Sequence, residues 1–314
     1  MYRAPRMARP IVATLFALGT ALAPLRPQLP PPTRCGTGIP TSETKGYVPL
    51  PRGDVFCPLV ADPKAARSFL SYLQERSDSG GTTSTIDMAS VGVGDVFALG
   101  RWNGSRPGDG VQLALAASVF AQFDLGTKSY DLLNADYVVG LPLTMRSGWY
   151  SSRLRIYHQS SHLGDEYLLR EPANRRNREN VSFEAVEWIM SADGGPLRLY
   201  GGGEYLFDRS PKDLEHYVAH AGVELRPWAR VIRLGALGGF RFVGGTDLKA
   251  SQEHDWTPSV SVQAGLEYDR AGDADPPGRR WGIFFEWYDG PSPYGQFFRD
   301  DVRHIGVGLH FGGM

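Results

Sequence analysis

Alternation of apolar and polar residues with a period of two recurs through most of this 314-residue chain. In an extended strand, such alternation places apolar side chains on one face and polar side chains on the other. The alternating segments are commonly as long as the ~9–11 residues that a tilted strand needs to cross a membrane. Arginine and glutamate recur on the polar face, as expected for the wet interior of a membrane barrel. The pattern predicts an all-β fold, a closed antiparallel transmembrane β-barrel.

The connections between these segments support the same fold. We expect short turns at residues 147–148, 193–196 and 227–229. We expect longer connections at residues 126–134, 164–180, 244–255 and 290–300. Short periplasmic turns that alternate with longer external loops are typical of outer-membrane barrels, and we count about twelve strands. The alternative that stays open is a soluble β-sandwich, in which strands are also polar on one side only.

Two segments bear on the strand count. Residues 65–74 fit either a first strand or a short helix. Alternation of Ile232, Leu234, Phe240 and Phe242 with arginines predicts a single strand over residues 232–242.

The N-terminus has the pattern of an export signal. Arg3, Arg6 and Arg9 precede an apolar run at residues 11–18, and small residues that suit a cleavage site follow it. The run is too short to favour a membrane-spanning helix. We therefore expect a signal peptide over residues 1–21.

Residues 22–63 are rich in proline and glycine and show no periodicity, which predicts a periplasmic leader with few contacts. The barrel would then occupy residues 64–314. Cys35 and Cys57 are the only cysteines, and in an oxidising compartment we expect them to pair. The formal net charge of −1 gives no reason to expect nucleic acid as a partner. The expected location is the bacterial outer membrane, and the expected partners are its lipids.

The stretch at residues 153–166 carries an anomaly. Leu154 and Ile156 lie on its aliphatic face, and His158 and Ser160 follow on that same face, where water should be scarce. Residues two apart on a strand face are separated by ~6.5–7 Å, so a histidine ring and a serine hydroxyl can turn towards each other. This is the arrangement of a nucleophile and its general base.

A third residue is needed to orient the imidazole. Glu184 shares a face with Val186 and Trp188 on the next predicted strand, so we predict His158, Ser160 and Glu184 as catalytic residues. Asn180 is a substitute for Glu184. The structural alternative is that these polar side chains mark the membrane interface, or that a bulge turns them into the lumen.

Metal sites are weakly indicated. His158 and His162 lie ~13 Å apart on a regular strand, too far for one ion. Asp165 and Glu166 are candidate Ca²⁺ ligands, although solvated loop carboxylates explain them equally well. We expect no other cofactor.

Four stretches resemble a known family: residues 120–124, 134–137, 157–166 and 263–267. They are similar to the uncharacterised bacterial domain-of-unknown-function family 1207, and the likeness runs from about Cys57 to the C-terminus. The resemblance implies an outer-membrane β-barrel and implies no activity.

A looser resemblance is to the outer-membrane phospholipase A and lipid A deacylase barrels. In those enzymes a histidine and a serine two apart lie on a lipid-facing strand, with asparagine or glutamate on the next strand. The resemblance gives His158, Ser160 and Glu184 comparable places. Two features differ. Ser161 stands where those enzymes usually have asparagine, and Glu184 lies farther along the chain than the third residue does in those enzymes.

Three functional hypotheses follow. The first is an outer-membrane barrel with a structural role or one that passes small solutes, unless lumen arginines and glutamates pair and plug it. The second is a lipid-acting serine esterase built on His158, Ser160 and Glu184. The third is a surface binding protein that uses the loops at residues 164–180 and 290–300.

Overall fold

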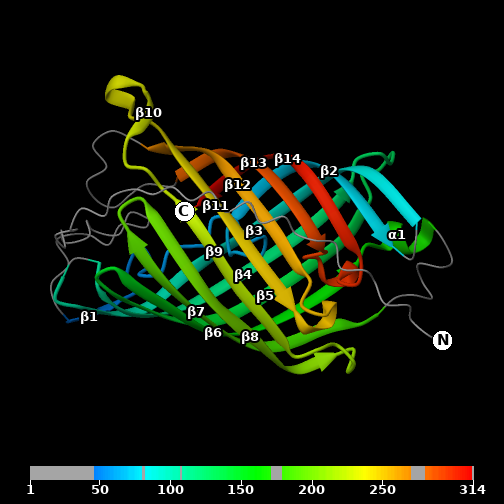
Figure 1. Cartoon of the computed structure of the whole chain (residues 1–314), viewed down its shortest axis with the longest axis horizontal. Coiled ribbons are helices and arrows are strands. Elements are labelled where there is room, and N and C mark those ends of the chain that lie inside the picture. The colour runs from blue at the N-terminus through cyan, green and yellow to red at the C-terminus, as the bar shows by residue number, and fades with distance from the viewer. Residues whose placement is uncertain (1–45, 80–81, 107, 171–178, 270–279, 313–314) are drawn as a thin grey trace, which may run out of the picture.

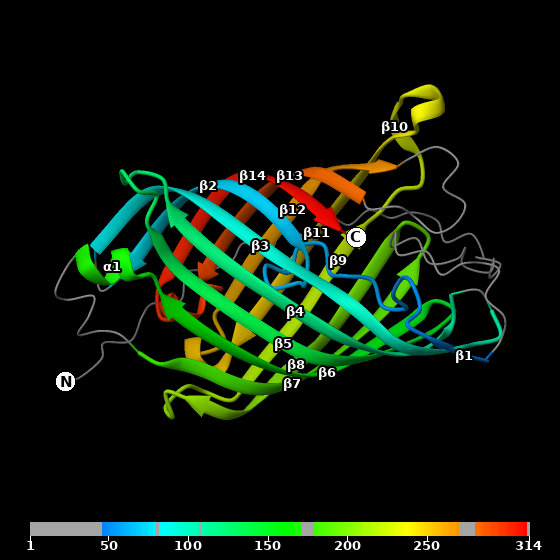
Figure 2. The same ribbon diagram turned by 180° about the vertical axis from the view of Figure 1, so that it is seen from behind.

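The computed structural model describes residues 46–79, 82–106, 108–170, 179–269 and 280–312. They form a closed barrel of 12 antiparallel strands (Figures 1 and 2), which confirms the predicted fold class and strand count. Each strand pairs with its neighbour in the chain, and the pairings of β2 with β14 and of β3 with β4 complete the cylinder. The strands are β2 (Ser68–Ser79), β3 (Thr82–Asn103), β4 (Gly110–Asp124), β5 (Leu132–Ser147), β6 (Tyr150–Leu163), β7 (Val181–Gly194), β8 (Leu197–Ser210), β9 (Tyr217–Leu225), β11 (Gly239–Ser251), β12 (Pro258–Asp269), β13 (Arg280–Pro291) and β14 (Asp301–Gly312).

The two faces of the wall differ as the alternation predicts. Ile156 and Trp188 on the outer face are 50% and 53% exposed, whereas Arg155 and Glu187 on the inner face are buried. Large apolar side chains are exposed around the outside of the barrel, including Leu141, Phe285 and Val307. An outer apolar band around a charged interior is the pattern of a membrane barrel.

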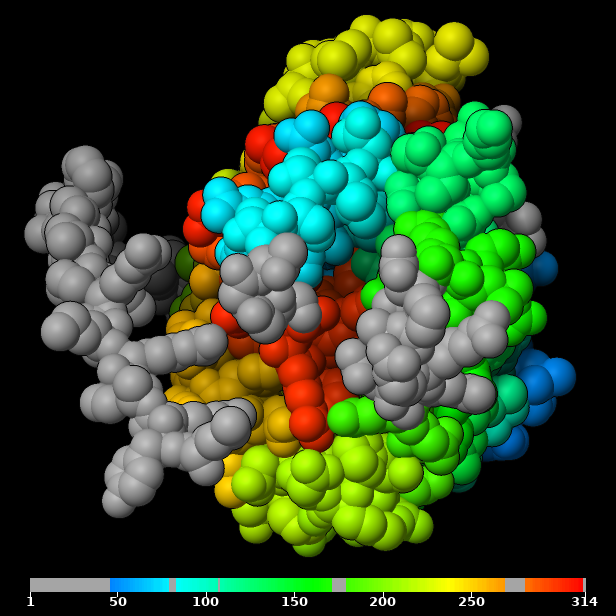
Figure 3. Space-filling model, turned by 90° about the vertical axis from the view of Figure 1, so that its right-hand side faces the viewer, coloured from blue at the N-terminus to red at the C-terminus, as the bar shows by residue number. Residues whose placement is uncertain are grey.

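The two ends of the barrel also differ. At one end, the short-turn end, β5 joins β6 and β7 joins β8 through tight turns at Gly148 and Gly195, both with positive φ. At the other, the long-loop end, lie α1 (Asp165–Arg170), η2 (Gln252–His254) and η3 (Gly295–Phe297). Figure 3 looks onto this end, where the orange-to-red connection between β13 and β14 lies across the mouth. None of the helices in the described ranges is long and apolar enough to cross a membrane.

The prediction of one strand over residues 232–242, followed by a long loop over residues 244–255, is wrong. The chain instead forms β10 (Arg230–Arg233), turns through η1 (Gly235–Leu237) and returns as β11. Gly235 and Gly238 adopt positive φ values of 61° and 104°, which glycine reaches without strain. The alternation of apolar residues continues through this turn, so periodicity alone does not reveal it.

The sequence did not predict the first two strands of the barrel clearly. Residues 65–74, which fit either a strand or a helix, contain the beginning of strand β2. The 22-residue strand β3 was not predicted. Its inner face carries small residues such as Ser90, Gly92 and Gly94 rather than charges, so the expected contrast between the two faces is weak.

The expectation that the leader makes few contacts is also wrong for its described part. β1 (Gly46–Pro49) extends the wall beside the end of β3. Residues 51–67, which we call the lumen segment, then run through the barrel interior before β2 begins (Figure 2). Phe56 and Leu59 are buried against Ile189 and Tyr200 of the opposite wall.

The lumen segment has no regular secondary structure, so its backbone polar groups need other partners. Lumen arginines supply several. Arg146 Nε donates to the carbonyl of Val55 at 2.9 Å, and Arg198 donates to that of Cys57 at 3.0 Å. The amide of Val60 donates to Glu224 at 2.8 Å. The segment is therefore held by hydrogen bonds from several strands around the barrel.

The remaining N-terminal predictions are not tested by the fold. The signal peptide at residues 1–21, the first part of the leader and Cys35 lie outside the described residues. Cys57 is disulfide-bonded.

Candidate active site on the outer wall

The positions of the candidate catalytic residues follow from the pairing of β6 with its two neighbours. Register places Ser160 opposite Tyr137 of β5 and opposite Ser182 of β7. His158 lies opposite Glu184 of β7. Alternate side chains of β6 are exposed and buried, and His158 and Ser160 belong to the outward set. The structure therefore places all three predicted residues together on the outer wall.

His158 and Glu184 are in direct contact. Nδ1 of His158 lies 2.9 Å from Oε1 of Glu184, and each side chain is 40% exposed. An ionised carboxylate only accepts hydrogen bonds, so the histidine donates through Nδ1. In the neutral imidazole this contact leaves Nε2 free to accept a proton, which is what a base that takes a proton from serine requires.

Ser160 is the third member of the candidate group and lies on the same face of β6 as His158. No hydrogen bond joins the Ser160 hydroxyl to His158 in the described part of the chain. The ~6.5–7 Å between alternate strand residues is a distance that side-chain rotation can close, and hydrogen bonds between catalytic groups are often long in the absence of substrate. Asn180, the substitute for Glu184, lies just ahead of β7. The catalytic roles of these residues stay predictions.

The inner side of the same wall is tightly held. Asp136 of β5 accepts hydrogen bonds from Ser161, from Asn134 at 3.0 Å and from the backbone amide of Gly295 at 3.2 Å. Lys64 of the lumen segment forms an ion pair with the same carboxylate. A Cβ at Gly295 would lie 1.8 Å from Ser161 Oγ, so only glycine fits there. These contacts fix β5 and β6 directly behind Ser160, which favours a precisely held outer face.

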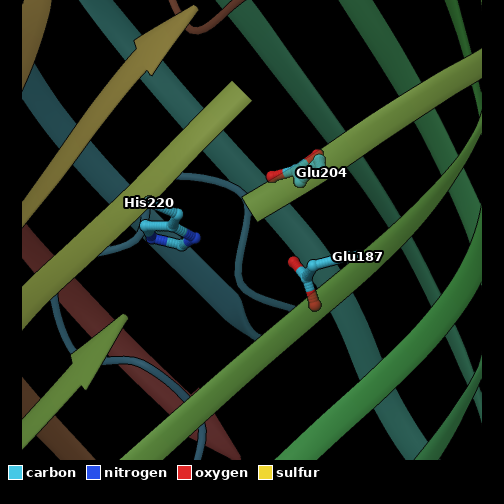
Figure 4. Close-up of side chains that lie close together, drawn as sticks. All are labelled: Glu187, Glu204 and His220. Atoms are coloured by element: carbon cyan, nitrogen blue, oxygen red, sulfur yellow. The ribbon is translucent and has the colours of Figure 1, made fainter. Parts of the chain in front are cut away.

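A second polar cluster lies in the lumen, on β7, β8 and β9. Figure 4 shows Glu187, Glu204 and His220 pointing towards one another, with their nearest ligand atoms all within 4.8 Å. Such a group could in principle hold a metal ion. Both oxygens of Glu187 accept from Arg153, at 2.7 and 3.1 Å, and Arg155 donates to one of them at 2.7 Å.

Protein side chains that surround this cluster account for the buried carboxylates without a metal ion. Lys249 Nζ lies 3.8 Å from Glu204 and 3.1 Å from Asp62, and His220 Nε2 lies 2.6 Å from Asp247. Buried carboxylates need counterions, and Lys249, Arg153 and Arg155 provide them. The predicted pairing of lumen arginines with glutamates is present, and the cluster belongs to an ion-pair network in the interior, beside a cavity whose lining includes Arg155, Glu204 and Lys249.

The candidate Ca²⁺ ligands Asp165 and Glu166 are exposed in the first turn of α1. Arg170 ends this helix and binds Asp124 and Asp131, each at 2.8 Å. A hydrogen bond from a neighbouring serine hydroxyl lowers the pKa of Asp131, and Arg170 acts in the same direction. α1 is thus tethered to the connection between β4 and β5, while the Ca²⁺ role of its acidic residues stays a prediction.

The closed wall of antiparallel strands, the apolar outer face and the charged interior define the chain as a β-barrel of the outer-membrane type. The family described as "Protein of unknown function (DUF1207)" matches residues 30–313. The chain belongs to this family, which confirms the resemblance found in the sequence. No curated protein matches the chain.

Solved structures of outer-membrane barrels are similar to this one. Outer membrane phospholipase A from Escherichia coli has 14% identity and a TM-score of 0.51, with 80% of this chain and 93% of that chain covered. An active-site mutant of that enzyme has 13% identity and a TM-score of 0.53, with 89% and 99% covered. The calcium-bound dimer of the Salmonella typhi phospholipase has 12% identity, a TM-score of 0.51, and 80% and 93% covered. At these identities the similarity shows the fold alone.

Sequence reasoning missed several residues around the candidate site. Tyr137 lies beside Ser160 in register, and its ring packs edge-on against His162 with centroids 5.8 Å apart. Asp247 and Lys249 of β11 went unrecognised as lumen residues because their strand was taken for a loop. The alternation of β5 already places Tyr137 on the outer face, but only the strand register shows that it adjoins Ser160.

Proposed function

We propose that this protein is an outer-membrane esterase that acts on membrane lipids, of the phospholipase or lipid A deacylase type. Ser160 is the nucleophile, His158 the general base and Glu184 the residue that orients the imidazole. The observation that carries the proposal is the 2.9 Å contact between His158 Nδ1 and Glu184 Oε1 beside Ser160, on the outer wall. A hydrogen-bonded histidine and carboxylate have no structural need to lie among Ile156 and Trp188 on an apolar surface.

The chemistry is acyl transfer in two steps. The Ser160 hydroxyl attacks the ester carbonyl carbon while its proton passes to Nε2 of His158. The ester C–O bond breaks, the same proton passes to the departing alcohol, and the acyl group remains on Ser160. Water, deprotonated by His158, then attacks the acyl carbon. The bond from this carbon to Ser160 Oγ breaks, the proton passes from His158 to Oγ, and the fatty acid leaves. Glu184 stabilises the imidazolium that forms in each step.

The outer surface supports a location in a lipid bilayer. Large apolar side chains cover the outward face of the barrel, as expected where a wall meets hydrocarbon. Lipids are then the molecules that His158 and Ser160 face. Sucrose-gradient fractionation should place the protein with the outer membrane, and recovery in the soluble fraction would refute this part of the proposal.

The lumen argues against passage of small solutes. The lumen segment is hydrogen-bonded to strands on several sides of the barrel, and the ion pairs around Glu187 narrow the interior beside it to a cavity lined in part by Arg155, Glu204 and Lys249. Opening a path would leave several buried charges without partners.

The proposal is tested with purified full-length protein and phospholipid or lipopolysaccharide in detergent micelles. Wild type should release free fatty acid, and Ser160→Ala should abolish the release. Ser152→Ala is the matched control, because Ser152 belongs to the same alternate set of β6 as Ser160, and its hydroxyl accepts a hydrogen bond from the indole N–H of outward-facing Trp188 at 2.9 Å. Turnover by Ser160→Ala equal to that of wild type, or no release by wild type from either lipid, would refute the proposal.

A further inference from the structure

The barrel wall has a step at its short-turn end. β2 begins at Ser68, β13 begins at Arg280 and β14 ends at Gly312, whereas β3 continues to Asn103. In Figure 2, β3 to β6 run on to the right beyond the ends of β2, β13 and β14. Between the pairings of Gly92 with β2 and of Gly100 with β1, no described strand pairs with that side of β3.

A groove on the outer surface starts at this step and crosses the wall to the candidate site. The residues that line it include Val93, Phe97, Ala117, Tyr137, Val139 and His158. Val93 and Phe97 are 63% and 56% exposed, so the groove offers apolar surface to the surroundings.

Strand register shows that the groove leads directly to the candidate catalytic residues. One row of paired residues runs from Asp95 through Ala117 and Val139 to His158. The adjacent row runs from Val93 through Val119 and Tyr137 to Ser160. Three steps between neighbouring strands, at ~4.8 Å each, give a groove roughly 14 Å long.

The chemistry of the groove suits a hydrocarbon chain. Most of its lining is aliphatic or aromatic, and Ala117 leaves room along its floor. The polar lining residues Ser68, Ser118 and Arg280 come from other strands, and Asp95 stands at the far end, where its carboxylate accepts a hydrogen bond from the amide of Val96 at 2.8 Å. From β6, His158 lines the groove.

The direction of the groove suits a lipid in the leaflet at the long-loop end. His158 lies near that end of β6, whereas the row reaches β3 at Asp95, well towards the short-turn end. A lipid of this leaflet holds its ester bonds near the surface and extends its acyl chains towards the membrane centre. An ester placed at Ser160 would therefore direct its chain along the groove.

We propose that this groove binds the acyl chain of the ester substrate, so that the enzyme selects lipids with long apolar chains and cleaves the bond at the carbonyl held beside Ser160. The proposal rests on the proposed function and deepens it. Apolar contact with the groove contributes binding roughly in proportion to the hydrocarbon area buried.

The test fills the groove and compares substrates of two chain lengths. Ala117→Trp places a bulky ring in the groove, away from His158 and Ser160. Ala221→Trp is the matched control, since Ala221 is exposed on the outer face of β9, outside the groove. The measured quantity is the ratio of kcat/KM for palmitoyl and butyryl p-nitrophenyl esters. Ala117→Trp should lower this ratio at least about tenfold, the equivalent of losing contact with about two methylene groups.

The outcomes separate this proposal from the proposed function. If butyryl ester is hydrolysed but Ala117→Trp leaves the ratio as in Ala221→Trp, the groove proposal fails and the esterase stands. If wild type hydrolyses neither ester, both fail. Should Ala117→Trp not fold, Val93→Trp tests the same groove at a more exposed position. It should lower the palmitoyl to butyryl ratio of kcat/KM by the same factor, and an unchanged ratio would refute the groove proposal.

Discussion

Replacing Glu184 with glutamine tests the carboxylate that contacts His158. The substitution keeps the size of the side chain but removes the negative charge that faces the imidazolium during reaction. Two unit charges ~4 Å apart attract by about 1 kcal/mol in water and by about 4 kcal/mol at an effective dielectric of ~20. Both side chains are 40% exposed, so solvent screens the pair and the lower half of this range applies. We expect a loss of about 1–2.5 kcal/mol in transition-state stabilisation, a roughly five- to seventyfold lower kcat/KM.

The assay is fatty-acid release from phospholipid in detergent micelles. Asp87→Asn is the matched control, because Asp87 is an exposed carboxylate of β3 that accepts a hydrogen bond from Tyr72 at 2.9 Å. It removes the same charge without touching His158, so its activity should equal that of wild type. Equal activities of Glu184→Gln and Asp87→Asn would refute the assignment of Glu184.

Three further predictions concern the interior and the loops. Glu187→Gln removes the counterion of buried Arg155 and half-buried Arg153 and should lower the free energy of unfolding in urea by about 3–5 kcal/mol. Exposed Glu166→Gln should leave it unchanged, and equal stabilities of the two variants would contradict the ion-pair account. Wild type should be closed in single-channel recordings and a variant lacking residues 54–62 should conduct, whereas a conducting wild type would contradict a lumen obstructed by this segment. If Asp165 and Glu166 bind Ca²⁺, activity should fall on chelation and Asp165→Asn should respond less; activity indifferent to chelation would end that assignment.

The fold was largely predictable because the barrel imposes one rule on most strands. β4, β6 and β9 show it clearly, with apolar residues outside and residues such as Gln112, Arg155 and Glu224 inside. The rule fails where the inner face is small, as in β3, and where apolar spacing continues through a turn, as at Gly235.

The lumen segment was not predictable for a different reason. Its buried residues show no period, because an irregular chain inside a barrel has no alternating environment to follow. Arg146 and Arg198 bind its backbone carbonyls, and no pattern in the sequence indicates that they do.

The candidate site was predictable in composition and only partly in geometry. The period of two places His158, Ser160 and Glu184 on outward faces, which the structure bears out. That His158 and Glu184 are direct partners depends on the register of β6 and β7, which pairs these two residues. No periodicity within a single strand contains this information.

The most direct test of the account is covalent labelling of the active serine. A fluorophosphonate reacts with a serine only when a base has activated its hydroxyl. After incubation of the full-length protein in detergent, peptide mass spectrometry should find the adduct on Ser160, and His158→Ala should abolish it. An unlabelled Ser160 in wild type, or equal labelling in His158→Ala, would contradict the claim that the outer wall carries an esterase.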